Sequence, residues 1–190
     1  MRFHEGSLVL HPTGFELARA IRVGSERYEY HETRKTRNTY NLAHDPENDR
    51  LISQLGAVGE LAVATVLGVE DHWIECTDDY RTLTGDVMPG VEVRTTQHRE
   101  GNLLLHHRDH DDRAYVSCRL HWDHNRRHLD AIEIIGWQTG RNGKRSEYWW
   151  AGANGNRPCF RVPRANLIKG TRTLLTWQSR HHRDQNIRAC

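Results

Sequence analysis

The feature that most constrains the fold is an apolar stretch at residues 55–69, in which Glu60 is the only ionisable side chain. The pattern predicts a helix over residues 50–67 that ends at Gly68, because glycine readily adopts the left-handed conformation that closes a helix. A carboxylate in so apolar a surface is costly unless a cation compensates it. We therefore expect Glu60 to pair with an arginine inside the fold, to lie in a solvent-open groove, or to face a metal site.

A second informative stretch, residues 85–96, places acids and a base on either side of a tight turn. Side chains alternate along a strand, so Glu92 and Arg94 are expected to share one face while the valines beside them point into a core. Asp86 precedes the turn and is expected to meet Glu92 at the end of a hairpin. Two carboxylates beside a fixed cation would form a cradle for a divalent metal and a phosphate.

Length and composition are those of one globular domain. The chain has 190 residues, of which 36% are hydrophobic and 27% charged, enough to bury a real core. We expect a single domain over residues 1–175, with an N-terminal helical segment, and a polar C-terminal tail over residues 176–190. The chain start lacks the apolar core of a signal peptide, and we expect no segment apolar enough to span a membrane. These features predict a cytoplasmic protein.

The charge pattern permits a nucleic-acid partner without demanding one. The formal net charge is only +2, but a local basic face is sufficient for phosphate contacts. Basic and aromatic residues mix over residues 27–38, which are expected to be either a solvated helix face or a nucleic-acid-binding surface. The candidate phosphate contacts are Arg34, Lys35 and Arg37, with Arg126 and Arg127 in a second basic segment.

The remaining elements follow from local signals. Thr13 is a predicted N-cap of a first helix that runs toward Tyr40, and Asp49 is a predicted N-cap of the apolar helix. Strands are predicted at residues 72–76, 86–88, 91–97, 103–106, 114–120 and 131–137. The apolar run at 131–137 indicates burial on both faces. Residues 121–130 are predicted to be a charged hairpin loop.

The order of a helical Glu60, then Asp86, then Glu92-x-Arg94 resembles the PD-(D/E)XK nuclease superfamily, which includes many restriction enzymes. The segments GELAVA at 59–64, VEVRTT at 91–96 and IGW at 135–137 are similar to a small phage- and bacterium-associated branch. The resemblance covers roughly residues 13–168 at motif level. It implies an α/β fold: a restriction-endonuclease-like α/β/α core with a central mixed sheet of about four to six strands. It also implies a metal-dependent DNA endonuclease that hydrolyses phosphodiester bonds.

The same residues suit a hard cation. Asp86 and Glu92 could hold Mg²⁺, with Glu60 as a direct or water-mediated ligand and the carbonyl of Val93 completing the shell. Mn²⁺ is expected to substitute for Mg²⁺. Gln97 is expected near the same end of the strand, where it would assist the substrate or a metal-bound water.

Arg94 stands where the resembling family has lysine. Arginine stays charged and cannot act as a base, so its role is restricted to orienting water or stabilising the phosphate. This departure motivates an alternative: a catalytically weak or inactive nuclease-like protein that binds nucleic acid or a partner protein. A third hypothesis is a structural protein in which Glu60 and Arg94 form a buried ion pair. Cutting both strands of a duplex would most simply need a homodimer.

Two histidine-rich segments offer weaker metal candidates. His121, Asp123, His124 and His128 could bind zinc, although the four cysteines of the chain are far apart and form no CxxC pair. Residues 106–112 could hold a second metal or form a charged loop. Neither a GxSxG motif nor a Walker loop is present, so serine hydrolase and nucleotide triphosphatase chemistry have no support.

Overall fold

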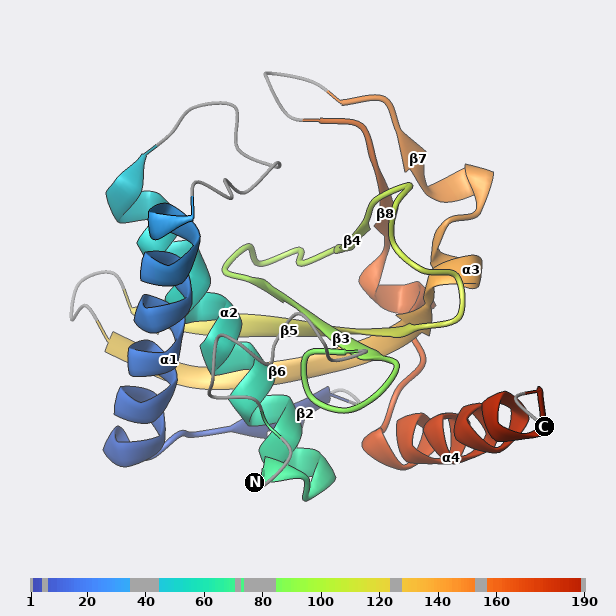
Figure 1. Cartoon of the computed structure of the whole chain (residues 1–190), viewed down its shortest axis with the longest axis horizontal. Coiled ribbons are helices and arrows are strands. Elements are labelled where there is room, and N and C mark those ends of the chain that lie inside the picture. The colour runs from blue at the N-terminus through green and yellow to red at the C-terminus, as the bar shows by residue number, and fades with distance from the viewer. Residues whose placement is uncertain are drawn as a thin grey trace.

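The computed structural model describes residues 2–4, 7–34, 45–70, 73, 85–123, 128–152 and 157–188. Within them a mixed sheet has helices packed on it, and a smaller sheet lies beside it (Figure 1). The helices are α1 (Gly14–Thr33), α2 (Pro46–Leu67), α3 (Gly140–Gly143) and α4 (Thr171–Arg188), with short 3-10 turns at Ser146–Tyr148 and Arg164–Asn166. The strands are β1 (Arg2–His4), β2 (Ser7–Leu10), β3 (Val91–Thr96), β4 (Leu103–Leu105), β5 (Ala114–Asp123), β6 (His128–Thr139), β7 (Trp149–Trp150) and β8 (Cys159–Val162).

The larger sheet has five strands in the order β1-β2-β6-β5-β3, and the smaller has the order β4-β8-β7. β3 pairs with β5 in parallel, from Val91 opposite Ala114 to Thr96 opposite Arg119. The other pairings are antiparallel. The α/β class and the mixed sheet with helices are therefore confirmed. β3 forms one edge of the larger sheet, and this position matters for the site.

α1 begins where the sequence predicts. The backbone N–H of Glu16 donates to the Thr13 hydroxyl at 3.2 Å, and the N–H of Thr13 donates to the Glu16 carboxylate at 2.7 Å. This reciprocal pair is a capping box, which satisfies two donors at the helix start. The helix ends at Thr33, so its predicted extension toward Tyr40 is not helical at residue 34, and residues 35–44 lie outside the described part.

α2 starts one turn earlier than predicted. Its N-cap is Asp45, whose carboxylate accepts from the N–H of Asn48 at 3.3 Å, and Pro46 occupies the first helical position. Proline suits that position because its missing N–H would have no helical partner. Asp49, the predicted cap, therefore lies inside the first turn. The predicted end is confirmed, since Gly68 closes the helix with φ 68°.

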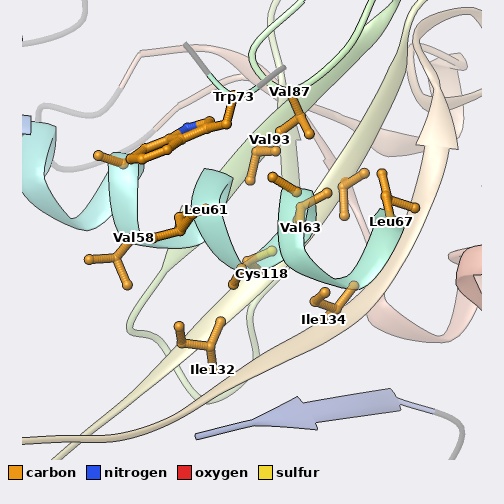
Figure 2. Packing of buried hydrophobic residues seen from close by; sticks show 14 of the residues in the cluster. Val58, Leu61, Val63, Leu67, Trp73, Val87, Val93, Cys118, Ile132 and Ile134 are labelled. Atoms are coloured by element: carbon orange, nitrogen blue, oxygen red, sulfur yellow. The ribbon is translucent and has the colours of Figure 1, made fainter. Parts of the chain in front are cut away.

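The apolar face of α2 packs on the larger sheet. Figure 2 shows Val58, Leu61, Val63 and Leu67 of α2 facing side chains of the strands, which include Val93, Cys118, Ile132 and Ile134. Burial of each large aliphatic side chain stabilises the fold by roughly 1.5–3 kcal/mol. Val91 and Val93 both belong to this core, so the alternation predicted along β3 is confirmed.

α2 also corrects the expectation about membrane-spanning segments. By length and composition this helix is apolar enough to cross a bilayer, contrary to the prediction that no segment is. Half of its most apolar window, however, is buried inside the protein. Packing against α1 and the sheet accounts for the buried half of this apolar window.

β5 and β6 form a longer hairpin than predicted. β5 continues to Asp123 and β6 resumes at His128, so most of the predicted loop at 121–130 is strand. Residues 131–138 are buried, which confirms burial on both faces of this strand. Ile132 and Ile134 pack toward α2, whereas Ile135 packs with residues of β4 and β8 in a second cluster.

The C-terminal boundary predicted at residue 176 falls inside α4. Leu174 of this helix is buried, and the ring of Trp177 lies 5.7 Å from that of Trp137 on β6. The first turns of the predicted tail are therefore helical and contact the sheet. The strand predicted at 72–76 lies outside the described residues, apart from Trp73.

Candidate active site at the edge of the sheet

A tight turn places Asp86 beside β3. The N–H of Asp86 donates to the Val91 carbonyl at 2.9 Å, and the N–H of Val91 donates to the Met88 carbonyl at 3.0 Å. Gly85 is required here because a Cβ on it would lie 2.7 Å from the Val91 carbonyl oxygen. The predicted hairpin is thus a turn with a single bridge between Met88 and Val91, and residues 86–88 are not a strand.

The side chain of Asp86 is held by the backbone of the same strand. Its Oδ2 atom accepts from the N–H of Val93 at 2.7 Å. Burial, together with the charges of Glu60 and Glu92, raises the pKa of Asp86 well above its usual range, and these effects outweigh the hydrogen bond from Val93 and the charge of Arg94. Asp86 has no ion-pair partner within the described residues.

Glu92 and Arg94 project from the opposite face of β3 to the buried valines. The Arg94 Nη1 atom lies 3.6 Å from Glu92 Oε2, and Nη2 lies 3.3 Å from Asp109 Oδ1. Its guanidinium is 5.2 Å from the ring centre of Tyr115. Burial alone would lower the pKa of Arg94, but Asp109, Asp86 and Glu92 raise it above its usual value. Arg94 therefore remains a cation with a defined orientation.

Glu92 has a second cationic partner. Arg113 donates to its Oε1 atom from the residue directly before β5. Both oxygens of Glu92 thus face a guanidinium in this arrangement, one from Arg94 and one from Arg113. The parallel pairing of β3 with β5 brings Arg113 to this position.

Glu60 is buried on the helical side of the sheet. Its Oε2 atom accepts from Arg27 of α1 at 2.7 Å and from the indole N–H of Trp73 at 3.2 Å. An arginine partner inside the fold, one of the alternatives for Glu60, is therefore present. A buried Glu60–Arg94 ion pair is not observed, because Arg94 contacts Glu92 and Asp109 instead.

Asp86 is the residue that connects the two sides of the sheet edge. It interacts electrostatically with Glu60 on the helical side and with Glu92 on the other. In the part of the chain that the structure describes, no three Asp, Glu, His or Cys side chains are gathered as ligands of one ion. The three predicted carboxylates are thus electrostatic neighbours, with Glu60 and Glu92 engaged by separate arginines.

The donor types nevertheless fit a hard cation at Asp86. Burial and the charges of Glu60 and Glu92 raise the pKa of Asp86, and a bound cation would counter both effects. Oxygen donors are the ligands that Mg²⁺ prefers. The Val93 carbonyl faces the same region, where Arg94 Nη1 approaches it at 3.4 Å. To bind the metal, Glu92 would have to give up its contact with Arg94 or Arg113. Glu60 would have to give up its contact with Arg27, or bind the metal through a water molecule.

The other predicted site residues are more dispersed. Gln97 is exposed just beyond β3. Arg34 is exposed at the end of α1, where its guanidinium lies 3.7 Å from the ring centre of Tyr30. The other predicted nucleic-acid contacts lie outside the described residues: Lys35, Arg37, Arg126 and Arg127.

Neither histidine-rich segment gathers a metal site in the described residues. The imidazole of His121 contacts Glu133 at 3.2 Å, while His124 lies outside the described part. In the loop at 106–112, Asp109 accepts from the N–H of His106 at 2.9 Å and also contacts Arg94. The loop therefore supports the candidate site.

Sequence reasoning missed five residues of this arrangement: Arg27, Trp73, Asp109, Arg113 and Tyr115. Each lies at least thirteen positions from its partner, and only tertiary pairing brings them together. The one local signal was the charge of residues 107–113, directly before a predicted strand.

Comparison with known proteins adds no relative. No family model, curated protein or solved structure matches the chain. The function must therefore be argued from the site itself.

Proposed function

We propose that the protein is a metal-dependent nuclease that hydrolyses phosphodiester bonds in DNA, built on a restriction-endonuclease-like core. The observation that carries the proposal is the setting of Asp86. Its carboxylate accepts a hydrogen bond from the N–H of Val93, its pKa is raised by burial and by the charges of Glu60 and Glu92, and it interacts electrostatically with Arg94. Strongly shifted acids in such a setting are candidates for functional sites.

The chain offers oxygen donors and cations for separate tasks. Asp86, Glu92 and the Val93 carbonyl would hold Mg²⁺ or Mn²⁺, with Glu60 contributing from the helical side. When bound, the cation would supply an activated water and neutralise charge on the phosphate. Asp86 is half-buried and is held on β3 by the hydrogen bond from Val93, so it is oriented before any ligand arrives.

Arg94 would stabilise the phosphate as its charge grows. Glu92, Asp109 and the Tyr115 ring orient the guanidinium, and its raised pKa keeps it charged. Fixed donors aimed at developing charge are worth about 100- to 1,000-fold in rate. Since arginine does not exchange its proton at neutral pH, Arg94 would not act as a base.

A second candidate is a protein of the same fold that binds nucleic acid or a partner protein without cutting. The pairing of Glu92 with Arg113, and of Glu60 with Arg27, favours this alternative. These arginines already neutralise two of the three acids, which reduces the need for a metal.

Cleavage assays separate the two candidates. Supercoiled and linear DNA are incubated with Mg²⁺ or Mn²⁺ and the wild-type protein, Asp86→Asn or Glu92→Gln. Exposed Asp130→Asn and Glu147→Gln are the matched controls. We expect cleavage by the wild type and the controls. Cleavage by the site variants should be at least about 10- to 100-fold slower, the range for loss of support at a metal site. Nicked circles indicate that one strand is cut, whereas linear products indicate that both strands are cut, as we expect of a homodimer. Cleavage that survives both site variants contradicts the assignment, and binding without cleavage supports the second candidate.

A further inference from the structure

A groove opens along β3 directly beside Arg94. It has a volume of about 520 Å³ and is lined by the first half of α2, by β3 and the residues after it, and by strand β4. We call it the β3 groove. Its lining comprises Asn48, Leu51, Ile52, Leu55, Gly56, Val93, Arg94, Thr95, Thr96, Gln97, His98, Asn102, Leu104, His106 and Leu120.

The walls of the β3 groove are apolar and exposed. Leu51 and Ile52 on α2 are 42% and 45% exposed, and Leu104 on β4 is 43% exposed. They are three of the seven large hydrophobic residues that are exposed in the described part of the chain. A concentration of exposed apolar side chains around one concavity indicates a binding surface.

The polar lining of the groove favours an anion. Its charged or titratable members are Arg94, His98 and His106, and no aspartate or glutamate lines it. Amides from Asn48, Gln97 and Asn102 add donors and acceptors of hydrogen bonds. Acids are concentrated instead at the neighbouring cluster of Asp86 and Glu92. The groove thus combines apolar walls with a neutral-to-basic lining.

The β4 wall continues into an aromatic–cation pair. Arg161 of β8 lies opposite Leu104 in the ladder, so the two side chains share one face of the smaller sheet. The Arg161 guanidinium lies 3.3 Å from the ring centre of Trp150. A guanidinium stacked on an indole offers both a flat surface and a positive charge beyond the groove.

We propose that the β3 groove binds unpaired nucleotides, so that the substrate is single-stranded nucleic acid or the single-stranded segment of a branched one. The inference rests on the proposed function and names its substrate class. The exposed faces of an unpaired base could pack between Leu51, Ile52 and Leu104. Its exposed edges could form hydrogen bonds with the side-chain amides that line the groove. Its phosphate would reach Arg94 at the inner end. A paired duplex conceals its base faces in the stack, so they cannot pack on these apolar walls.

The lining of the β3 groove favours unpaired nucleotides over a peptide strand that would pair with the edge of β3. A peptide would be held mainly by backbone pairing along β3. A neutral-to-basic lining without acids gives a peptide no general advantage, whereas it suits the phosphates of a nucleic acid. Single-strand binding through apolar and basic surfaces is a recurrent mode and is tolerant of sequence. If the groove binds a peptide instead, the groove variants will leave the affinity for single-stranded nucleic acid unchanged in the test below.

The test measures binding without cleavage. A single-stranded oligonucleotide carrying 2-aminopurine, and the duplex of the same sequence, are titrated with the protein in EDTA by fluorescence intensity and anisotropy. The decisive variant is Ile52→Glu, which puts a negative charge on the groove wall. Ile21→Glu on α1 is the matched control, since Ile21 has a similar exposure of 39% and does not line the groove. Leu104→Glu tests the opposite wall, and thermal melting checks that each variant folds.

We expect the wild type to bind the single strand at least about tenfold more tightly than the duplex. Ile52→Glu and Leu104→Glu should each weaken single-strand binding about tenfold or more, the scale of one lost base-stacking contact, while Ile21→Glu changes it less than about twofold. Single-strand affinity that is unchanged in both groove variants, or duplex preference in the wild type, overturns the inference. If the wild type cleaves duplex DNA but the groove variants bind the single strand as tightly as the wild type, only the groove inference fails. If it neither binds nor cuts any nucleic acid, the proposed function fails as well.

Discussion

The carboxylate of Asp86 accepts a hydrogen bond from the backbone N–H of Val93 at 2.7 Å. The acid is thereby tied to the strand that also carries Glu92 and Arg94. Because a backbone group holds it, the position of the Asp86 side chain does not depend on a second mobile side chain. Glu60 and Glu92 act on this one group from the two sides of β3.

Asp86→Asn should stabilise the metal-free protein at neutral pH. The amide oxygen can still accept from Val93, and the repulsion by Glu60 and Glu92 is removed. The pKa of Asp86 is raised in the folded state, so the acid does not destabilise the fold below its unfolded pKa. The free energy of unfolding then decreases as the pH rises through the folded pKa. In EDTA, urea unfolding should therefore show the variant more stable than the wild type at pH 7 and equal to it near pH 3. Mg²⁺ should raise the Tm of the wild type only. A variant that is less stable at pH 7 contradicts this account.

Removing the charge of Glu60 should cost much more than removing that of an exposed glutamate. Glu60→Gln removes the carboxylate that Arg27 contacts at 2.7 Å, and the Arg27 side chain is only 12% exposed. We expect the free energy of unfolding to fall by about 1.5–3 kcal/mol, the range for a hydrogen bond to a charged group. Glu26→Gln is the control, because the Arg22–Glu26 pair on α1 is exposed and such pairs contribute about 0.3–0.5 kcal/mol. Urea denaturation measures both.

The double variant Arg27→Met with Glu60→Leu should recover most of the stability lost in Glu60→Gln, because apolar side chains of similar size then replace both members of the buried ion pair. If it retains cleavage as well, Glu60 is a structural residue. If it folds but does not cleave, Glu60 contributes to the site.

Two glycines should respond to alanine in opposite directions. A Cβ on Gly24 of α1 would lie 2.7 Å from the backbone nitrogen of Gln54 on α2, so the two helices would have to move apart. Gly24→Ala is expected to lower the unfolding free energy by about 1–3 kcal/mol. Gly56 lies inside α2 with nothing within 4 Å of an added Cβ, and Gly56→Ala should raise it by about 0.8–1 kcal/mol. Equal effects in thermal melting would show that the α1–α2 contact is looser than described.

Glu133 should make the fold sensitive to acid. Burial alone would raise its pKa, but hydrogen bonds from Arg164, His121 and Ser7 and the charge of Arg164 lower it below the usual value. The corresponding stability is present above the unfolded pKa and is lost as the pH falls through the folded pKa. Glu133→Gln should cost about 3–5 kcal/mol at pH 7 and flatten the decline between about pH 5 and 3. Exposed Glu147→Gln serves as the control. An unchanged acid profile in Glu133→Gln would show that other groups dominate.

Local signals predicted the elements whose ends are set by neighbouring residues. The Thr13 capping box, the Gly68 terminus and the alternation along β3 depend on interactions within a few positions. The start of α2 was placed at Asp49 instead of Asp45 because both residues can cap a helix, and the sequence does not show which one supplies the bond to Asn48. The strand extension through residues 121–123 was missed because its charged side chains are typical of loops.

The sequence by itself determined that Glu60 would be isolated on an apolar helix and that Glu92 and Arg94 would share a strand face. Only the tertiary structure decided which partner each would meet. Arg27 reaches Glu60 because α1 packs on α2, and Arg113 reaches Glu92 because β5 runs parallel to β3. The physical reason is that spacing along a strand or helix is governed by short-range geometry, whereas pairing between distant elements depends on how the whole core packs.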